Sequence, residues 1–202
     1  MKNFDKKYLV NGKKYLAGTD EAGRGPLAGP VVAAAVVLKT RRFKNRIDDS
    51  KKLSARQREK AFREIGTKSV FGIGIVSEKV IDEINILQAT LMAMKQAVSE
   101  LCSKLEERKP LKKKMHVLVD GNMKLETGIS TTSIIAGDTK SKSIACASIL
   151  AKVTRDRIMD AYDKVYPQYG FIRHKGYSTE MHRKALLKFG PSEIHRKTFS
   201  YV

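Results

Sequence analysis

The 202-residue chain has no tryptophan, only two cysteines and no apolar run as long as a membrane span. Two cysteines cannot form a disulfide framework and lack the spacing of metal ligands, so we expect Cys102 and Cys146 to be reduced thiols. The N-terminus lacks the apolar segment of a signal peptide, which predicts a cytoplasmic location. The sequence also lacks internal repeats, low-complexity segments and linkers, and we therefore expect one domain, residues 1–202.

Acidic residues are scarce relative to basic ones. The chain has 21 Asp and Glu against 40 Lys and Arg, a formal net charge of +19. Such an excess suits a polyanionic partner such as nucleic acid, although it also serves solubility. The charge does not distinguish an enzyme from a binding protein.

Hydrophobic periodicity predicts alternating strands and helices. Strands are expected at residues 15–20, 31–38, 69–76, 116–119 and 133–136. Helices are expected at 54–65, from 77 to about 105, from 141 to 166, at 179–189 and at 192–201, with an aromatic and basic loop at 171–177. The long helix between the third and fourth strands is a crossover, so these two strands should run parallel as neighbours or near-neighbours.

Glycine and leucine patterns suggest how two of these elements pack. Gly72 and Gly74 interrupt the third strand and are expected to be twist or bulge points. Leucine, methionine and valine recur at alternating steps of four and three, which predicts one buried stripe on the long helix. Its members are Leu87, Leu91, Met94, Val98, Leu101 and Leu105.

The few acidic residues include four at the ends of predicted elements. Asp20 and Glu21 end the first strand, Asp120 ends the fourth, and Asp138 precedes a helix. Neighbouring side chains of a strand point to opposite faces, so Asp20 and Glu21 could share a site only if the strand breaks there. Glycines at positions 23 and 25 permit such a break.

Four converging carboxylates would repel one another unless cations or shifted pKa values compensate them. Oxygen ligands favour Mg²⁺ or Mn²⁺, and two such ions close together are the usual apparatus of phosphodiester hydrolysis. The pattern therefore favours a nuclease. The alternative is a basic nucleic-acid binding protein without catalysis, in which the same acids are turn residues and helix caps.

Other motif interpretations are weaker. Residues 23–28 match a glycine-rich dinucleotide fingerprint, but a strand rather than a helix is predicted next. The histidines lack zinc-ligand spacing and are expected to be structural or on the surface. They are His116, His174, His182 and His195.

Several segments together resemble ribonuclease HII, the type 2 ribonuclease H, from about residue 15 to 199 and in the family's order. They are Gly18–Pro26, Asp49–Leu53, Asp120–Asn122, Gly137–Ser141, Ser143–Ala145, Ser148–Asp156, His174–Tyr177 and His195–Lys197. Cys146 and Ser178 stand where the family usually has alanine and glycine.

The resemblance implies an α/β protein with an RNase H-like fold. Its centre would be a mixed five-stranded sheet flanked by helices, and residues from about 165 to 202 would form a helical, substrate-binding C-terminal part. It implies an endonuclease, dependent on Mg²⁺ or Mn²⁺, that hydrolyses the RNA strand of RNA–DNA hybrids. It also implies incision 5′ of single ribonucleotides in duplex DNA, leaving 3′-hydroxyl and 5′-phosphate ends.

The resemblance also assigns roles to individual residues. The implied catalytic and metal-binding residues are Asp20, Glu21, Asp120 and Asp138. The implied substrate-binding residues are Gly23, Arg24, Gly25 and Tyr177, to which the charge pattern adds Lys51 as a phosphate contact. The family favours a monomer, and the sequence leaves open a sliding clamp as a partner and a junction resolvase as a rival enzyme of the same fold.

Overall fold

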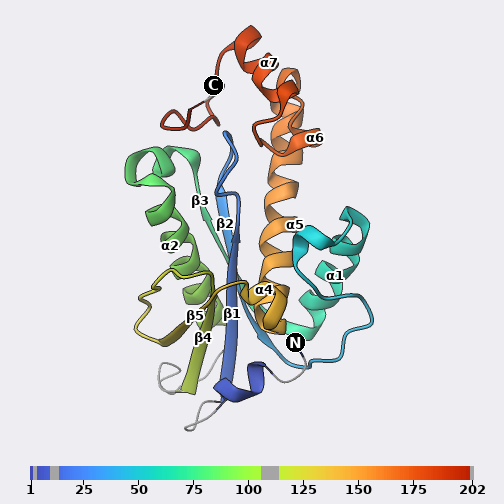
Figure 1. Cartoon of the computed structure of the whole chain (residues 1–202), viewed down its shortest axis with the longest axis vertical. Helices are drawn as coiled ribbons and strands as arrows, with labels where there is room; N and C mark the ends of the chain where they lie inside the picture. Colours follow the sequence, from blue (N-terminus) through green and yellow to red (C-terminus); the bar gives the residue numbers. More distant parts are fainter. Residues whose placement is uncertain (2–3, 10–13, 106–113, 201–202) are drawn as a thin grey trace.

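A computed structural model of the chain describes residues 1, 4–9, 14–105 and 114–200. Its centre is a five-stranded sheet in the order β3-β2-β1-β4-β5 (Figure 1). The strands are β1 (Tyr15–Ala22), β2 (Val31–Leu38), β3 (Ser69–Val76), β4 (Met115–Asp120) and β5 (Ser130–Ile134). The first three strands pair antiparallel, whereas β1 with β4 and β4 with β5 pair parallel, which confirms the mixed sheet.

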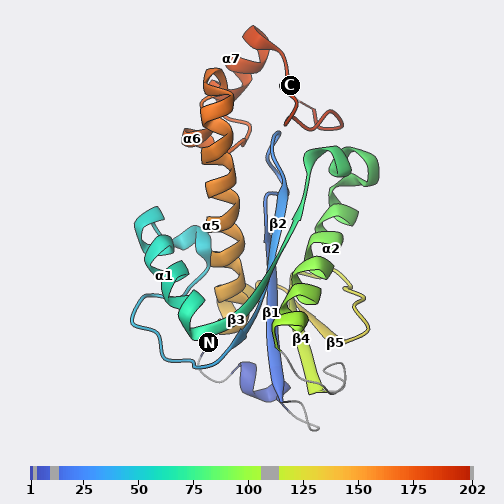
Figure 2. The same cartoon turned by 180° about the vertical axis from the view of Figure 1, so that it is seen from behind.

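Helices cover both faces of the sheet. The α-helices are α1 (Ala55–Lys68), α2 (Glu78–Lys104), α4 (Gly137–Lys140), α5 (Lys142–Val165), α6 (Phe171–His174) and α7 (Glu180–Phe189). Figures 1 and 2 show α2 on one face, α1 and α5 on the other, and α6 and α7 beyond the sheet at the far end of α5. No helix in the described ranges is both long and apolar enough to cross a membrane.

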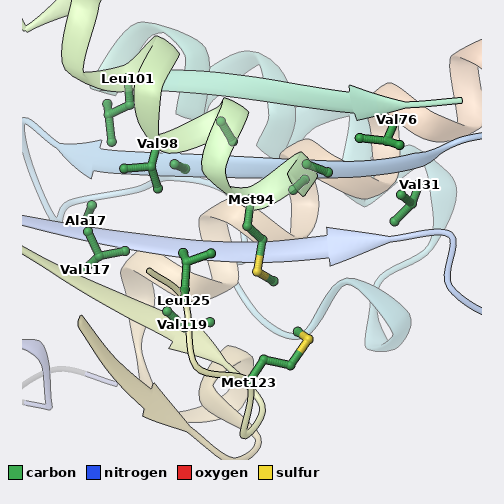
Figure 3. Packing of buried hydrophobic residues seen from close by; sticks show 14 of the residues in the cluster. Ala17, Val31, Val76, Met94, Val98, Leu101, Val117, Val119, Met123 and Leu125 are labelled. Atoms are coloured by element: carbon green, nitrogen blue, oxygen red, sulfur yellow. The ribbon is translucent and has the colours of Figure 1, made fainter. Parts of the chain in front are cut away.

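The strand β2 is buried on both sides, as its continuous apolar run predicts. Ala33 and Ala35 belong to a core cluster with α2, part of which is drawn in Figure 3. Ala34 and Val36 belong to a second cluster with α1 and α5. The alternation of a strand thus lets one short segment serve two hydrophobic cores.

The expected helix starts are confirmed by side-chain caps. Ser54 and Gln57 form a reciprocal capping box at α1, which runs three residues further than predicted. Ser141 accepts a hydrogen bond from the N–H of Ile144 and so caps α5. The crossover prediction is correct in direction, since β3 and β4 run the same way, but β2 and β1 lie between them.

Gly72 and Gly74 are not bulge points, because the β2–β3 register is unbroken along both strands. They let α2 lie directly on the sheet. A Cβ at Gly74 would lie 1.9 Å from the carbonyl oxygen of Ala93, and one at Gly72 would lie 2.2 Å from that of Ala97.

The predicted buried stripe of α2 is wrong at its first member. Asn85 has φ +66° and breaks the helical backbone, and its Oδ1 accepts hydrogen bonds from the N–H groups of Leu87 and Gln88. The helix therefore restarts after Asn85, and Leu87, which lies in the first turn of the restarted segment, is exposed. Met94, Val98 and Leu101 are buried as predicted.

The predicted helix at 192–201 is also wrong over its described part, residues 192–200. Tertiary pairing replaces it. His195 forms an isolated β-bridge with Ala28, and the N–H of Arg196 donates to the carbonyl of Leu27. The end of the chain is thereby tied to the segment that follows β1.

We predict that Gly74→Ala lowers the free energy of unfolding by about 1–3 kcal/mol, since helix α2 would have to move off the sheet. The matched control is Gly66→Ala on α1, where an added Cβ meets nothing within 4 Å. That change should raise the free energy of unfolding by roughly 0.5–1 kcal/mol, the usual advantage of alanine in a helix. Urea unfolding of the two variants measures both; equal effects would contradict the packing argument.

Candidate active site

A cavity of about 480 Å³ lies where β1 and β4 end. Its lining contains every site residue that the sequence predicts. The lining residues are Asp20, Glu21, Ala22, Gly23, Arg24, Gly25, Ser50, Lys51, Ile86, Asp120, Asp138, Ser148, Lys152 and Tyr177. Of these, Ala22, Ser50, Ile86, Ser148 and Lys152 were not predicted as site residues.

The opening of the sheet creates this cavity. The parallel β1–β4 ladder ends at the pair Thr19 and Val119, whereas β1 stays paired with β2 as far as Ala22. The predicted strand break after Asp20 is therefore wrong. Asp20 and Glu21 lie on a continuous strand that has lost one neighbour, so side chains from both faces reach the same opening.

Asp20 is almost fully buried, with 5% of its surface exposed. Burial raises the pKa of its carboxyl well above the usual value, and the charges of Glu21 and Asp120 raise it further. A contact with Ser148 and the N–H of Glu21, which donates to Asp20 Oδ1 at 2.7 Å, oppose the rise. The site thus holds a carboxylate whose negative charge is poorly compensated.

Glu21 has one oxygen without a partner. Its Oε1 lies 3.4 Å from Nη1 of Arg24, but its Oε2 is buried and has no hydrogen-bond partner among the described residues. Burial raises the pKa of this carboxyl, the charge of Arg24 lowers it, and the charge of Asp120 raises it again. An unpaired buried carboxylate oxygen is costly and suits a cation.

Asp120 joins the end of β4 to the helix that bears Asp138. Asp120 Oδ1 accepts hydrogen bonds from the N–H groups of Gly137 at 2.6 Å and Asp138 at 3.2 Å. A Cβ at Gly137 would lie 2.6 Å from Cδ1 of Ile144 and 3.0 Å from Asp120 Oδ1, so a side chain here would crowd both neighbours. Burial and the charges of Asp120 and Asp49 raise the pKa of Asp138, while Lys51 lowers it.

The four carboxylates suit a hard divalent cation. They supply only oxygen donors, the ligands that Mg²⁺ and Mn²⁺ prefer, and the unpartnered Glu21 Oε2 needs a positive partner. Within the described ranges, no three acidic, histidine or cysteine side chains are already arranged to hold a metal ion. The acids surround one cavity but would have to draw together on a cation.

A glycine loop and an aromatic ring line the same cavity as the carboxylates. Gly23 has φ +104°, and a Cβ there would lie 2.2 Å from Arg155 Nε, so this position requires glycine. A Cβ at Gly25 would first meet the ring of Tyr177, at 4.0 Å. Lys152 Nζ lies 5.7 Å from the centre of the Tyr177 ring.

The histidines take no part in this cavity, and three of them are structural. His174, His182 and His195 are buried together beside Phe171, and His182 Nε2 lies 3.0 Å from His195 Nε2. Burial lowers the pKa of His182 and of His195 to about 4. His116 bonds Ser130 and Thr132 at the opposite end of the sheet.

Comparison with known proteins decides the family. A family model described as Ribonuclease HII matches residues 17–202. The chain belongs to the ribonuclease HII family. A curated ribonuclease HII of Acetivibrio thermocellus is 53% identical over 199 residues, which cover 98% of this chain and 74% of that protein.

Solved structures confirm the RNase H-like fold. The ribonuclease HII in the PCNA:RNase HII complex from Archaeoglobus fulgidus is 26% identical, with a TM-score of 0.73 over 92% of this chain and 95% of that chain. Bst-RNase HIII in complex with Mn²⁺ is 13% identical, with a TM-score of 0.71 over 96% of this chain and 69% of that chain. The second likeness is one of fold alone.

Family membership makes the chain an enzyme. Ribonuclease HII enzymes are divalent-metal-dependent endonucleases that hydrolyse RNA, and they act on the RNA strand of RNA–DNA hybrids. The basic binding protein without catalysis is therefore rejected, as is the junction resolvase.

We predict that Asp120→Asn stabilises the metal-free protein while abolishing metal-dependent cleavage. The amide oxygen can still accept from Gly137 and Asp138, but a charge that raises the pKa of Asp20 is gone. In EDTA at pH 7, the free energy of unfolding should rise by roughly 1 kcal/mol, the value of about one pKa unit. Duplex binding should survive.

The pH dependence of unfolding gives a second test of the stabilisation expected for Asp120→Asn. Because the pKa values of Asp20 and Glu21 are raised in the folded state, ionising them costs stability, and stability should increase as the pH falls through those values. Asp120→Asn should flatten this increase. The control is Glu83→Gln, which changes an exposed acid outside the cavity. It should alter neither the pH dependence of the free energy of unfolding nor the rate of cleavage. A destabilised Asp120→Asn with near-normal cleavage would remove Asp120 from the site.

Proposed function

We propose that this enzyme incises duplex DNA on the 5′ side of a single embedded ribonucleotide, in addition to hydrolysing RNA in hybrids. The observation that supports the proposal is the shared cavity: the loop Gly23–Gly25, Tyr177 and the four carboxylates all line it. A lone ribonucleotide differs from its neighbours only by its 2′-hydroxyl, so its recognition needs close backbone approach, which glycines allow.

The proposed metal ligands are the four carboxylates, which would hold two Mg²⁺ or Mn²⁺ ions in the catalytic state, with Asp20 shared between them. When bound, such ions lower the pKa of an attacking water and stabilise the leaving oxygen. Attack at phosphorus breaks the bond to the 3′-oxygen, which leaves a 3′-hydroxyl and a 5′-phosphate.

The remaining residues of the cavity would position the substrate. Lys51 and Lys152 add positive charge beside the acids and would neutralise phosphates flanking the scissile one. Tyr177 has 42% of its surface exposed, and its ring is free to pack on the sugar that follows the ribonucleotide. Arg24 would exchange its contact with Glu21 for a backbone phosphate when substrate binds.

The C-terminal part and the assembly belong to the same proposal. The single domain of residues 1–202 would use its part from about residue 165 onward to bind the duplex, because Tyr177 comes from it. All lining residues of the cavity belong to one chain, so a monomer would suffice. The Archaeoglobus fulgidus relative was solved with PCNA, and we propose a sliding clamp as a partner here too.

We predict distinct outcomes with three duplexes that contain no ribonucleotide, one ribonucleotide or four in a row, each incubated with Mg²⁺. The first should stay intact, and the other two should be cut. The single-ribonucleotide duplex should be cut only at its 5′ side, leaving a 3′-hydroxyl that a polymerase can extend. Cleavage of the four-ribonucleotide duplex alone would contradict single-ribonucleotide incision while leaving hybrid hydrolysis intact.

A matched pair of variants at exposed apolar side chains controls this experiment. Tyr177→Ala should lower kcat/KM on the single-ribonucleotide duplex by about tenfold, as expected when a stacking partner is lost. Ile75→Ala on β3 removes an apolar side chain that is similarly exposed, at 48% against 42%, but lies outside both the cavity and the C-terminal part, and it should leave kcat/KM unchanged.

A further inference from the structure

Arg196 is a fully buried arginine whose hydrogen bonds converge on one loop. Its Nη2 donates to the carbonyl of Gly23 at 2.6 Å, its Nη1 to those of Arg24 at 3.0 Å and Pro26 at 2.8 Å, and its Nε and Nη2 to that of Gly29. All these acceptors lie within residues 23–29. One guanidinium thus gathers four backbone carbonyls of the glycine loop.

Because the peptide bond is planar, the direction of these carbonyls also fixes the direction of the N–H groups in the same peptides. In a trans peptide, the carbonyl of one residue and the N–H of the next point in opposite directions. There are no cis peptide bonds among the described residues. Because the carbonyls of Gly23 and Arg24 point at Arg196, the N–H groups of Arg24 and Gly25 point away from it.

These two N–H groups have no acceptor within the described part of the chain. Both residues line the cavity that contains the four carboxylates. Other loop N–H groups are used internally: Leu27 donates to Gly176 and Gly29 donates to Ile194. The loop therefore offers two adjacent, unpaired donors beside the acids, and such a pair suits a hydroxyl or phosphate oxygen.

We propose that Arg196 is a positioning residue for ribose recognition: by holding the carbonyls of the glycine loop inward, it aims the N–H groups of Arg24 and Gly25 at the 2′-oxygen of the substrate. Arg196 itself is buried beneath the loop and does not touch the nucleic acid. The inference rests on the proposed incision at single ribonucleotides and adds the residue that sets its specificity.

The environment of Arg196 fits a charged guanidinium that cannot be replaced by lysine. Burial and the charge of Arg155 lower its pKa to about 9, while Glu78 and Asp82 oppose this, so it stays protonated at pH 7. The guanidinium carbon also lies 5.0 Å from the centre of the Phe199 ring. Lysine would keep the charge but lacks the planar fork that reaches four carbonyls.

Arg155 provides a matched comparison on the same loop. It is also fully buried and donates to the carbonyls of Ala28, Pro30 and Lys175. It packs against Gly23 and hydrogen-bonds the far end of the loop, but it donates to neither of the carbonyls, those of Gly23 and Arg24, that set the N–H groups of Arg24 and Gly25. Loss of either arginine should destabilise the fold, whereas only Arg196 should set the preference for a ribonucleotide.

The test compares wild type, Arg196→Lys and Arg155→Lys. Fluorescence anisotropy in EDTA, where no cleavage occurs, gives Kd for an all-DNA duplex and for the same duplex with one ribonucleotide; circular dichroism gives the melting temperature. In Arg196→Lys, the ratio of the Kd for all-DNA duplex to the Kd for the ribonucleotide duplex should fall about tenfold, as expected when two hydrogen-bond donors are misplaced. Its affinity for all-DNA duplex should stay within twofold of wild type.

The outcomes separate the two proposals. Arg155→Lys should melt at a lower temperature, as Arg196→Lys does, yet keep the wild-type ratio of the two Kd values. An Arg196→Lys protein that keeps both this ratio and the wild-type rate of single-ribonucleotide incision in Mg²⁺ overturns the role of Arg196. Wild type that does not incise the single-ribonucleotide duplex overturns the proposed function itself, whatever the variants do.

Discussion

The parting of β1 from β4 after the pair Thr19 and Val119 is the constraint on which the site depends. While two strands stay paired, the side chains of neighbouring residues are kept on opposite faces of the sheet. Once β4 ends, Asp20 and Glu21 both border open space, and Asp120 stands at the end of the departing strand. The glycine loop, held from below by Arg196, and the short helix with Asp138 complete the lining of the cavity.

This arrangement stores electrostatic repulsion in a protein that is otherwise strongly positive. Burial and mutual charge raise the pKa values of Asp20, Glu21 and Asp138, and one oxygen of Glu21 has no partner in the described structure. A phosphodiester brought to this cavity adds another negative charge. Divalent cations relieve both repulsions, so the metal dependence of the family follows from the charge balance of the site.

Much of the fold could be predicted from the sequence because local signals were strong. The first four strands, the caps Ser54 and Ser141 and the double burial of β2 follow from residue pattern alone, whereas the fifth strand, expected at 133–136, lies at Ser130–Ile134. The errors arise where distant segments decide the structure. Gly72 and Gly74 serve the close approach of α2, and the segment 192–200 gives up a helix to pair with the loop after β1.

The sequence predicted which residues belong to the site, but not the tertiary contacts that hold them in place. Each predicted residue lines the cavity, since glycines and acids at strand ends mark such places. The sequence could not show that Arg196 lies beneath a loop more than 160 residues away, because a buried arginine and a surface arginine look alike in one sequence. Lys152 and Ile86 were missed for the same reason: their place depends on how α5 and the kinked α2 pack.

The central claim is that the four acids form one cation-binding centre. Crystals of the protein grown with Mn²⁺ and a single-ribonucleotide duplex, measured at the manganese absorption edge, test it most directly. We expect two anomalous peaks in the cavity, both within coordination distance of Asp20, with Glu21, Asp120 and Asp138 completing the ligands. Peaks confined to other surfaces, with Asp120 and Asp138 left out of reach of any ion bound by Asp20, would contradict the account.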